Sequence, residues 1–298
     1  MNLLAAIELG GTKTVCGVVA ADGKLLARES IPTTTPTETY ARAIASVTTL
    51  ASDPGDICGI GVGNFGPIML NRSSTRYARI LETPKVGWAQ TDVLAEIGKH
   101  TTLPVAIDTD VNCALRAEAA WGAGVGRKNL VYVTIGTGIG AGIMIDGRLA
   151  NGRCHPEVGH MFLPQFADDR DFAGRCAFHG ALCAEGLAAG PAIEKRWGRP
   201  GAALASTHPA WDLEARYLAV LCINLALMAS PSRIILGGGV MQQPQLIGLI
   251  REHFVALMNN YIDLSVLADS VDELIVTPGL GSDSGVLGAG VIARQFLP

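Results

Sequence analysis

The chain has 298 residues, which is enough for two domains that each bury a core of their own. About half of the residues (49%) are hydrophobic and 17% are charged, which excludes a disordered or fibrous chain. The formal net charge is only −4 and no Lys/Arg cluster is present, which argues against nucleic acid or a membrane surface as a partner. The N-terminus lacks a basic signal region, and no apolar run approaches the roughly 18 residues that span a bilayer, so we expect a cytoplasmic protein.

The first half of the chain alternates predicted strands with predicted helices. Residues 3–20 form two strands around a turn at Gly10-Gly11, and a third strand starts at Leu25. Further elements follow from the spacing of apolar residues: helices over 37–51, 91–99 and 112–121, and strands over 57–62 and 105–107. The last of these strands ends in Asp108-Thr109-Asp110.

The second half begins with the same succession of elements. A strand over 131–135 leads into a Gly/Thr turn and a return strand over 141–145, and later a strand over 233–236 lies between helices over 210–228 and 246–258. Two related halves of this kind predict an α/β fold with two lobes and a ligand site in the cleft between them. Only the segment 151–190 shows little periodicity. A long irregular loop in a compact domain usually has a function of its own or is held in place by a stabilising feature.

Three glycine-rich turns could each hold part of a nucleotide. Backbone N–H groups of Gly10, Gly11 and Thr12 could approach a phosphate, with Lys13 adding positive charge, although an ordinary hairpin turn is the alternative. The second turn offers threonine hydroxyls and open backbone at Thr134, Gly136, Thr137 and Gly138. The third, at Gly237, Gly238 and Gly239, could pack against a base or ribose. None matches the P-loop or Rossmann fingerprint.

Asp110 is the candidate general base. Phosphoryl transfer needs positioned phosphates, a metal and a carboxylate near the attacking hydroxyl, and Asp110 follows a strand at a place where side chains project into a cleft. The alternative is that Asp108, Asp110 and Asn112 only cap the helix that follows.

Four segments together resemble the ROK family of sugar kinases and repressors. They are Gly10-Gly11-Thr12-Lys13, Asp108-x-Asp110-x-Asn112, Thr134-x-Gly136-Thr137-Gly138-x-Gly140-x-Gly142 and Glu157-Val158-Gly159-His160. The resemblance runs in order over nearly the whole chain. It implies two ribonuclease-H-like lobes of the actin/hexokinase superfamily: an N-terminal lobe over 1–115, to which a final helix at about 283–298 returns, and a C-terminal lobe over 116–282.

The resemblance also implies a magnesium- and ATP-dependent sugar kinase that pairs as a homodimer through the C-terminal lobe. Asp110 aligns with the catalytic base, residues 10–13 and 136–138 with phosphate loops, and Gly237 to Gly239 with the nucleotide side. Glu157, His160 and Glu185 match positions that contact sugar hydroxyls. Glu8 stands where most members have Asp, at a position that helps to organise hydrated magnesium.

A structural zinc site is expected in the irregular loop. His160, Cys176, His179 and Cys183 supply two imidazoles and two thiolates, a set that suits tetrahedral zinc. Most family members have a third cysteine where this chain has His179, as in the fructokinase branch, and the last spacing is one residue longer here. The alternative is a surface His179 with two buried thiols.

Several details favour fructose as the sugar, phosphorylated on C6 to give fructose 6-phosphate. Glu8 resembles the fructokinase branch, and Thr109 stands where glucose-specific members have Asn. A mannose or glucose kinase is the alternative enzyme. A sugar-responsive repressor would carry a DNA-binding segment ahead of the first turn, where only seven residues precede Glu8. A sugar-binding protein without activity is disfavoured by Asp110 and the phosphate loops.

Overall fold

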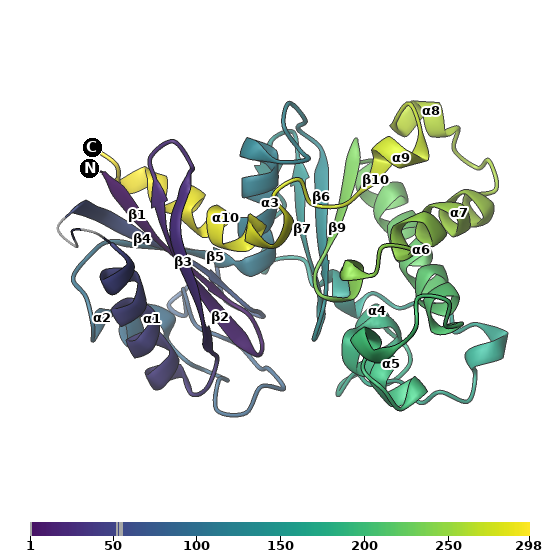
Figure 1. Ribbon diagram of the computed structural model, residues 1–298, viewed down its shortest axis with the longest axis horizontal. Helices are drawn as coiled ribbons and strands as arrows, with labels where there is room; N and C mark the ends of the chain where they lie inside the picture. Colours follow the sequence, from purple (N-terminus) through teal and green to yellow (C-terminus); the bar gives the residue numbers. More distant parts are fainter. Residues whose placement is uncertain (1, 52, 54–55) are drawn as a thin grey trace. The chain divides into compact units, whose positions relative to one another are not determined.

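The computed structural model describes residues 2–51, 53 and 56–298, and the chain divides into two compact units (Figure 1). Unit 1 contains Met1–Gly122, Ala150–Pro156 and Asp283–Pro298, and unit 2 contains Ala123–Leu149 and Glu157–Ser282. The sequence-based boundary at 115/116 falls inside a helix that belongs wholly to unit 1. Four residues of the expected N-terminal lobe lie outside the described residues: Met1, Ser52, Pro54 and Gly55.

Unit 1 is built on a five-stranded sheet in the order β3-β2-β1-β4-β5. Its strands are β1 (Leu3–Leu9), β2 (Lys13–Ala20), β3 (Leu25–Pro32), β4 (Ile57–Asn64) and β5 (Val105–Thr109). β1 pairs antiparallel with β2 and parallel with β4, and β5 continues the parallel side. The five predicted strands are confirmed, and β2 begins at Lys13, close behind the Gly10-Gly11 turn.

Helices of unit 1 pack on both faces of this sheet. Alternate residues of β1, from Leu3 to Leu9, pack in one cluster with Tyr40 and Val47 of α1 (Pro36–Leu50), beside the short helix α2 (Val93–Gly98). α3 (Asp110–Trp121) and α10 (Ser284–Ala293) pack together and against β4. A Cβ atom on Gly61 of β4 would lie 1.7 Å from the carbonyl oxygen of Ala289, so glycine permits this close approach.

Unit 2 repeats the topology of unit 1. Its sheet has the order β10-β9-β6-β7-β8, with β6 antiparallel to β7 and parallel to β9. The strands are β6 (Leu130–Ile135), β7 (Ile139–Ile145), β8 (Arg148–Leu149), β9 (Arg233–Gly237) and β10 (Ile275–Val276). With β6 in the place of β1, the two sheets have the same connections, which confirms the predicted doubling.

Helices α6 (Ala210–Ala229) and α7 (Leu246–Met258) of unit 2 pack against each other, as their periodicity predicts. The shorter helices are α4 (Ala184–Ala188), α5 (Gly190–Trp197), α8 (Leu264–Leu267) and α9 (Val271–Leu274). The expectation that 151–190 lacks regular structure is therefore wrong at its end. A five-residue helix is too short to show a period of 3.6 residues.

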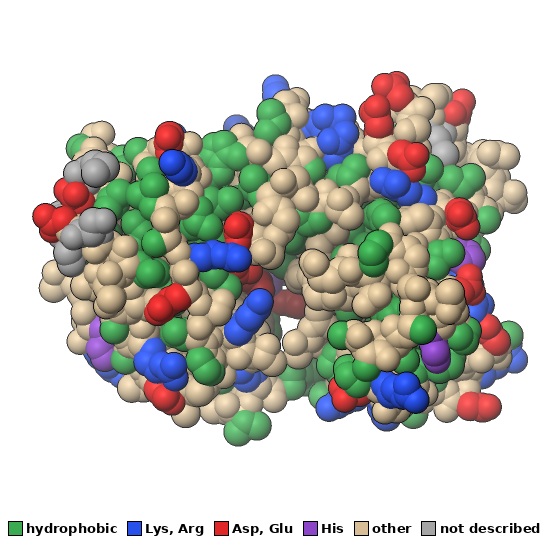
Figure 2. Space-filling view, viewed as in Figure 1, with side chains coloured by type: hydrophobic (Ala, Val, Ile, Leu, Met, Phe, Trp, Pro, Cys, Tyr) green, Lys and Arg blue, Asp and Glu red, His purple; other side chains and the backbone are tan. Residues whose placement is uncertain are grey.

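The surface carries mixed charge. On the face drawn in Figure 2, Lys and Arg side chains are scattered among Asp and Glu side chains. Within the described residues, no helix combines the length and the apolar character that crossing a membrane requires.

Candidate active site

The first glycine turn joins β1 to β2 in unit 1. The amide of Gly10 donates to the carbonyl oxygen of Lys13 at 2.9 Å, and the Thr33 hydroxyl donates to the carbonyl of Gly10 at 3.0 Å. A Cβ atom on Gly10 would lie 2.9 Å from the same Lys13 oxygen, which explains the glycine. Gly11, Thr12 and Lys13 are exposed, so their backbone and the Lys13 ammonium can meet a phosphate.

Asp110 lies where β5 passes into α3. Thr109 caps this helix, because its side chain accepts a hydrogen bond from the amide of Asn112 at 3.1 Å. Asp110 is the first helical residue, and one carboxylate oxygen accepts from the amide of Val111 at 2.9 Å. Burial of the carboxyl raises the pKa of Asp110 to about 7, although backbone hydrogen bonds partly oppose this. This pKa suits a general base near neutral pH.

Asp108 and Asn112 hold the junction in place. One carboxylate oxygen of Asp108 accepts from the side-chain amide of Asn112 at 2.6 Å and from the backbone amide of Thr109 at 2.9 Å. All three residues are buried. These neighbours of Asp110 therefore cap and support the start of α3, and Asp110 itself accepts from the amide of Val111, so the geometry is consistent with the capping alternative as well as with a general base.

Glu8 of β1 belongs to the same acidic group as Asp110. Burial raises the pKa of Glu8 to about 7, the charge of Asp110 adds to the rise, and Asp283 contributes further, whereas Lys13 and the amide of Val286 oppose it. Asp283, which forms an ion pair with Arg28, was not predicted from the sequence. Crowded carboxyl groups of this kind favour a bound cation.

The second glycine turn joins β6 to β7 in unit 2. The amide of Gly136 donates to the carbonyl of Gly138 at 2.9 Å, and the amide of Gly190 donates to the carbonyl of Gly136 at 2.8 Å. Glu185 of α4 accepts from the amide of Ile139 at 3.1 Å. Glu185, predicted to bind a sugar hydroxyl, thus lies directly against the predicted phosphate loop.

The third glycine turn follows β9 and lies beside the second. Thr134 of β6 pairs with Gly237 of β9, and the position of a Cβ atom on Gly136 is 3.9 Å from the amide nitrogen of Gly239. Gly238 has a φ of +94°, and a Cβ atom there would lie 2.3 Å from the carbonyl oxygen of Ile135. The structure therefore brings two of the predicted nucleotide turns together, with Thr137 exposed at the tip of the second.

Glu157 and His160 flank a short turn that packs against β7. A Cβ atom on Gly159 would lie 1.9 Å from the carbonyl oxygen of Ile139, the residue whose amide donates to Glu185. The turn that carries Glu157 and His160 and the carboxylate of Glu185 consequently both contact the start of β7. Glu157 is exposed, whereas His160 and Glu185 are partly buried.

Four predicted metal ligands form one cluster. The ligand atoms of His160, Cys176, His179 and Cys183 all lie within 4.8 Å of one another. The Cys176 sulfur is 3.7 Å from Nδ1 of His160 and of His179, and the Cys183 sulfur is 3.8 Å from Nδ1 of His160. Tetrahedral zinc with bonds of about 2.3 Å to sulfur and about 2.1 Å to nitrogen places such atoms roughly 3.6 Å apart. These residues could therefore hold a tetrahedral metal ion.

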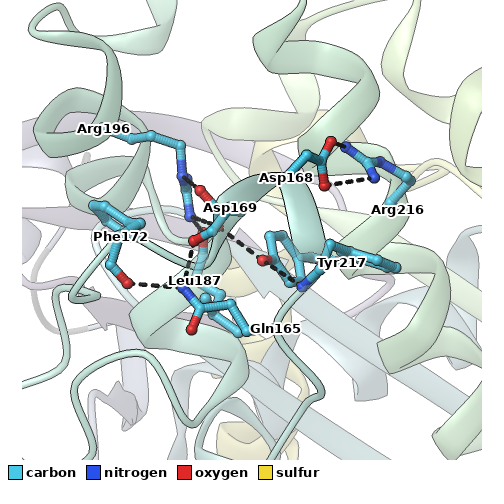
Figure 3. Close-up of polar contacts among 9 residues, drawn as sticks. Gln165, Asp168, Asp169, Phe172, Leu187, Arg196, Arg216 and Tyr217 are labelled. Atoms are coloured by element: carbon cyan, nitrogen blue, oxygen red, sulfur yellow. Dashed lines mark hydrogen bonds and ion pairs between the residues drawn. The ribbon is translucent and has the colours of Figure 1, made fainter.

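A buried ionic network ties the loop that carries Asp169, between His160 and Cys176, to α5. Asp169 accepts from Arg196 Nε at 2.9 Å and Nη2 at 3.0 Å, and from the Tyr217 hydroxyl at 2.8 Å (Figure 3). The Arg196 guanidinium lies 3.9 Å from the ring centroid of Phe172. Gln165 donates to the carbonyls of Asp169 and Phe172, which closes the loop on itself.

Lys85 is a second residue that sequence reasoning missed. Its ammonium donates to the carbonyl of Gly11 in the first glycine turn and lies 5.8 and 5.7 Å from the ring centroids of Phe65 and Trp88. Burial lowers the pKa of Lys85. Nothing in the sequence could indicate this contact, because 74 positions separate the two residues.

Known proteins resemble this chain along almost its full length. The sequence profile described as ROK family matches residues 4–296. The chain belongs to the ROK family. It is 41% identical over 295 residues to a putative fructokinase of Bacillus subtilis (strain 168), covering 99% of this chain and 96% of that protein. It is 42% identical to the fructokinase of Pediococcus pentosaceus, covering 99% of both chains.

A solved structure confirms the fold of this ROK family member. The ROK family glucokinase from Streptomyces griseus, in complex with glucose and AMPPNP, has a TM-score of 0.76 and 25% identity, with 98% of this chain and 99% of that chain covered. The predicted two-lobed α/β fold and family are thereby confirmed.

Proposed function

We propose that this ROK protein transfers the terminal phosphoryl group of ATP to fructose, producing fructose 6-phosphate. The observation that carries the proposal is Asp110, a carboxylate at a strand-to-helix junction whose pKa is raised to about 7. The exposed phosphate-loop residues and the acidic neighbour Glu8 belong to the same unit. The names of two relatives at 41% and 42% identity support fructose as the acceptor.

In the proposed reaction, Asp110 accepts the proton of the C6 hydroxyl as its oxygen attacks the terminal phosphorus of ATP in line with the leaving ADP. Ionised Asp110 orients this hydroxyl, while the junction formed by Asp108 and Asn112 prevents the carboxylate from shifting. The turn at Gly10 to Lys13 supplies N–H groups and one ammonium to the transferred phosphoryl group.

The proposal also assigns binding roles to residues of unit 2. The turns at Gly136 to Gly138 and Gly237 to Gly239 lie beside each other and offer backbone that ATP can approach closely. Glu157, His160 and Glu185 surround the start of β7 and offer oxygen and nitrogen atoms to fructose hydroxyls. Glu185 has one oxygen engaged by Ile139, which leaves the other for a sugar hydroxyl.

A magnesium ion fits the acidic group of unit 1. Burial raises the pKa of Glu8, and the charges of Asp110 and Asp283 add to the rise, so a divalent cation near Glu8 would relieve repulsion among these carboxyl groups. Bound magnesium neutralises charge on the phosphates of ATP during transfer. The chain's own contribution is to hold Glu8 between the sheet and α10, where the amide of Val286 donates to it.

Zinc fits the cluster of His160, Cys176, His179 and Cys183, and we propose that it has a structural role. The nitrogen-to-sulfur distances of 3.7 to 3.8 Å agree with one tetrahedral ion. Cys183 also caps α4, because its sulfur accepts from the amide of Gly186, and Glu185 is the second residue of that helix. A metal at this place would therefore fix the position of Glu185.

The substrate assignment is tested with wild-type protein, magnesium-ATP and a panel of fructose, mannose, glucose and N-acetylated hexosamines. We expect the highest kcat/KM for fructose, with Asp110→Asn as the control that abolishes turnover of every sugar. Preferential turnover of glucose or mannose would support the proposed kinase activity and refute fructose as the substrate. Absence of turnover on the whole panel would refute the kinase.

A further inference from the structure

An arginine-lined hollow in unit 1 has no place in the proposed reaction. It has a volume of about 370 Å³ and lies along β5, with walls that include Arg72, Tyr77, Asp108, Arg116, Asn151 and Gln295. A smaller hollow of about 280 Å³ shares Leu70, Arg72 and Asn151 with it and adds Arg153. Neither is lined by Glu8, Asp110 or the first glycine turn, and the larger one is of a size that holds small molecules.

Positive charge exceeds negative charge in these two hollows. Among the described residues, no carboxylate lies within ion-pair distance of Arg72 or Arg153, and both side chains are exposed. Arg116 Nε lies 3.5 Å from a carboxylate oxygen of Asp108. This nitrogen is buried and makes no hydrogen bond in the part of the chain that the structure describes. The two hollows are thus lined by three guanidinium groups from separate segments and by a single carboxylate, that of Asp108.

We propose that these joined hollows bind a phosphorylated small molecule, with the phosphate held by the three arginines. A guanidinium presents a planar fork of N–H donors that matches phosphate oxygens, and the Arg116 guanidinium lines the larger hollow beside Asp108. The uncharged remainder of the ligand has suitable neighbours in the amides of Asn151 and Gln295 and in the Tyr77 ring. The ligand class is therefore a phosphomonoester of a small polar molecule.

Binding at this site would reach Asp110 through Asp108. One oxygen of Asp108 approaches Arg116, while the other anchors Asn112 and the amide of Thr109, next to Asp110. A phosphate that draws Arg116 away from Asp108 changes the charge balance at this junction. The site thus regulates turnover, a step that rests on the proposed function, whereas the binding itself does not.

Binding is tested by calorimetric titration of the full chain with ribose 5-phosphate, with ribose and citrate as comparison ligands. We expect saturable binding of one ribose 5-phosphate per chain, and weaker binding of ribose and citrate. Arg72→Gln and Arg153→Gln should each weaken binding by about tenfold, because each removes a charge-assisted contact. Both side chains are exposed, so the variants should remain folded. Lys13→Gln, in the first glycine turn, should bind as tightly as wild type.

Three results would overturn the assignment of the site: absence of saturable binding, equal binding of citrate, or binding that is lost in Lys13→Gln and retained in the arginine variants. Regulation is tested separately at saturating ATP and fructose. Ribose 5-phosphate should change kcat of the wild type and leave that of Arg72→Gln unaltered. An unaltered wild-type kcat with intact binding would refute regulation and leave the binding site established.

Discussion

The carboxyl groups of Glu8 and Asp110 interact electrostatically within unit 1, and the charge of Asp110 adds to burial in raising the pKa of Glu8 to about 7. Asp110 itself has a pKa of about 7 through burial. Two buried carboxyl groups that both release protons near neutral pH lower the free energy of unfolding of the protein. Their cost is understandable if one serves as a base and the other attracts a cation.

The rate of phosphorylation should depend on the ionisation of Asp110. Only the carboxylate form can accept a proton, so kcat/KM for fructose should rise about tenfold per pH unit below pH 7 and level off above it. Initial rates between pH 5.5 and pH 9 at fixed ionic strength measure this profile. A profile that is flat across neutral pH would contradict the assignment of Asp110 as the base.

The same raised pKa values predict a stability change. The folded protein binds these two protons more tightly than the unfolded chain, so the free energy of unfolding should fall as the pH rises from about 4 to about 7. Asp110→Asn should therefore raise the free energy of unfolding at pH 8 by about 1–2 kcal/mol, since it removes a charge that burial disfavours. Partial contact of Asp110 with water keeps the gain this small.

Urea unfolding at pH 8 and at pH 4 checks this stability prediction. The gain from Asp110→Asn should be lost at pH 4, where the wild-type carboxyl is protonated. Asp171→Asn, at an exposed aspartate, is the matched control and should alter stability at neither pH. A gain of equal size at both pH values would show that ionisation is not its cause.

Removal of the metal should weaken the sugar site as well as the fold. Cys183→Ser removes one proposed ligand and keeps a side chain that can cap α4, so loss of the metal should lower the zinc content by about one ion per chain, lower Tm and raise KM for fructose. Elemental analysis, thermal unfolding and steady-state kinetics measure the three effects. Cys58→Ser, outside the cluster, should retain the metal; equal zinc content in both variants would exclude Cys183 as a ligand.

The buried network around Asp169 should contribute far more stability than ion pairs at the surface. Asp169→Asn leaves Arg196 buried without its partner and should cost about 3–5 kcal/mol. Asp272→Asn breaks an exposed pair with Arg251 and should cost less than about 1 kcal/mol. Denaturant unfolding of both variants compares them. Similar costs would indicate that the network in Figure 3 does not fasten the loop.

Much of the fold could be predicted because each half begins with a pattern of adjacent residues, two apolar runs separated by a glycine turn. Gly10-Gly11 and Gly136 to Gly138 both interrupt buried apolar runs, and a turn between two strands is encoded by adjacent residues. The two-residue strands β8 and β10 could not be predicted, since they have no room for an alternating pattern. The assignment of Ala150–Pro156 to unit 1 depends on tertiary contacts that no local pattern records.

In the candidate site, too, some residues could be predicted from the sequence and others could not. Asp110 and the metal ligands could be proposed because their residue types and spacing carry chemical meaning. Asp283 and Lys85 could not, because their importance comes from folding against Glu8 and Gly11, which lie far away in the sequence. Isolated charged residues in loops are most often solvated, so only the three-dimensional structure distinguishes these two.

The most direct test of the central claim is product analysis with fructose and magnesium-ATP for wild type and Asp110→Asn. We predict equal amounts of ADP and fructose 6-phosphate from the wild type, and a rate at least about a hundredfold lower from the variant. Release of ADP without a phosphorylated sugar, or equal rates from the two proteins, would contradict the claim that Asp110 promotes phosphoryl transfer to fructose.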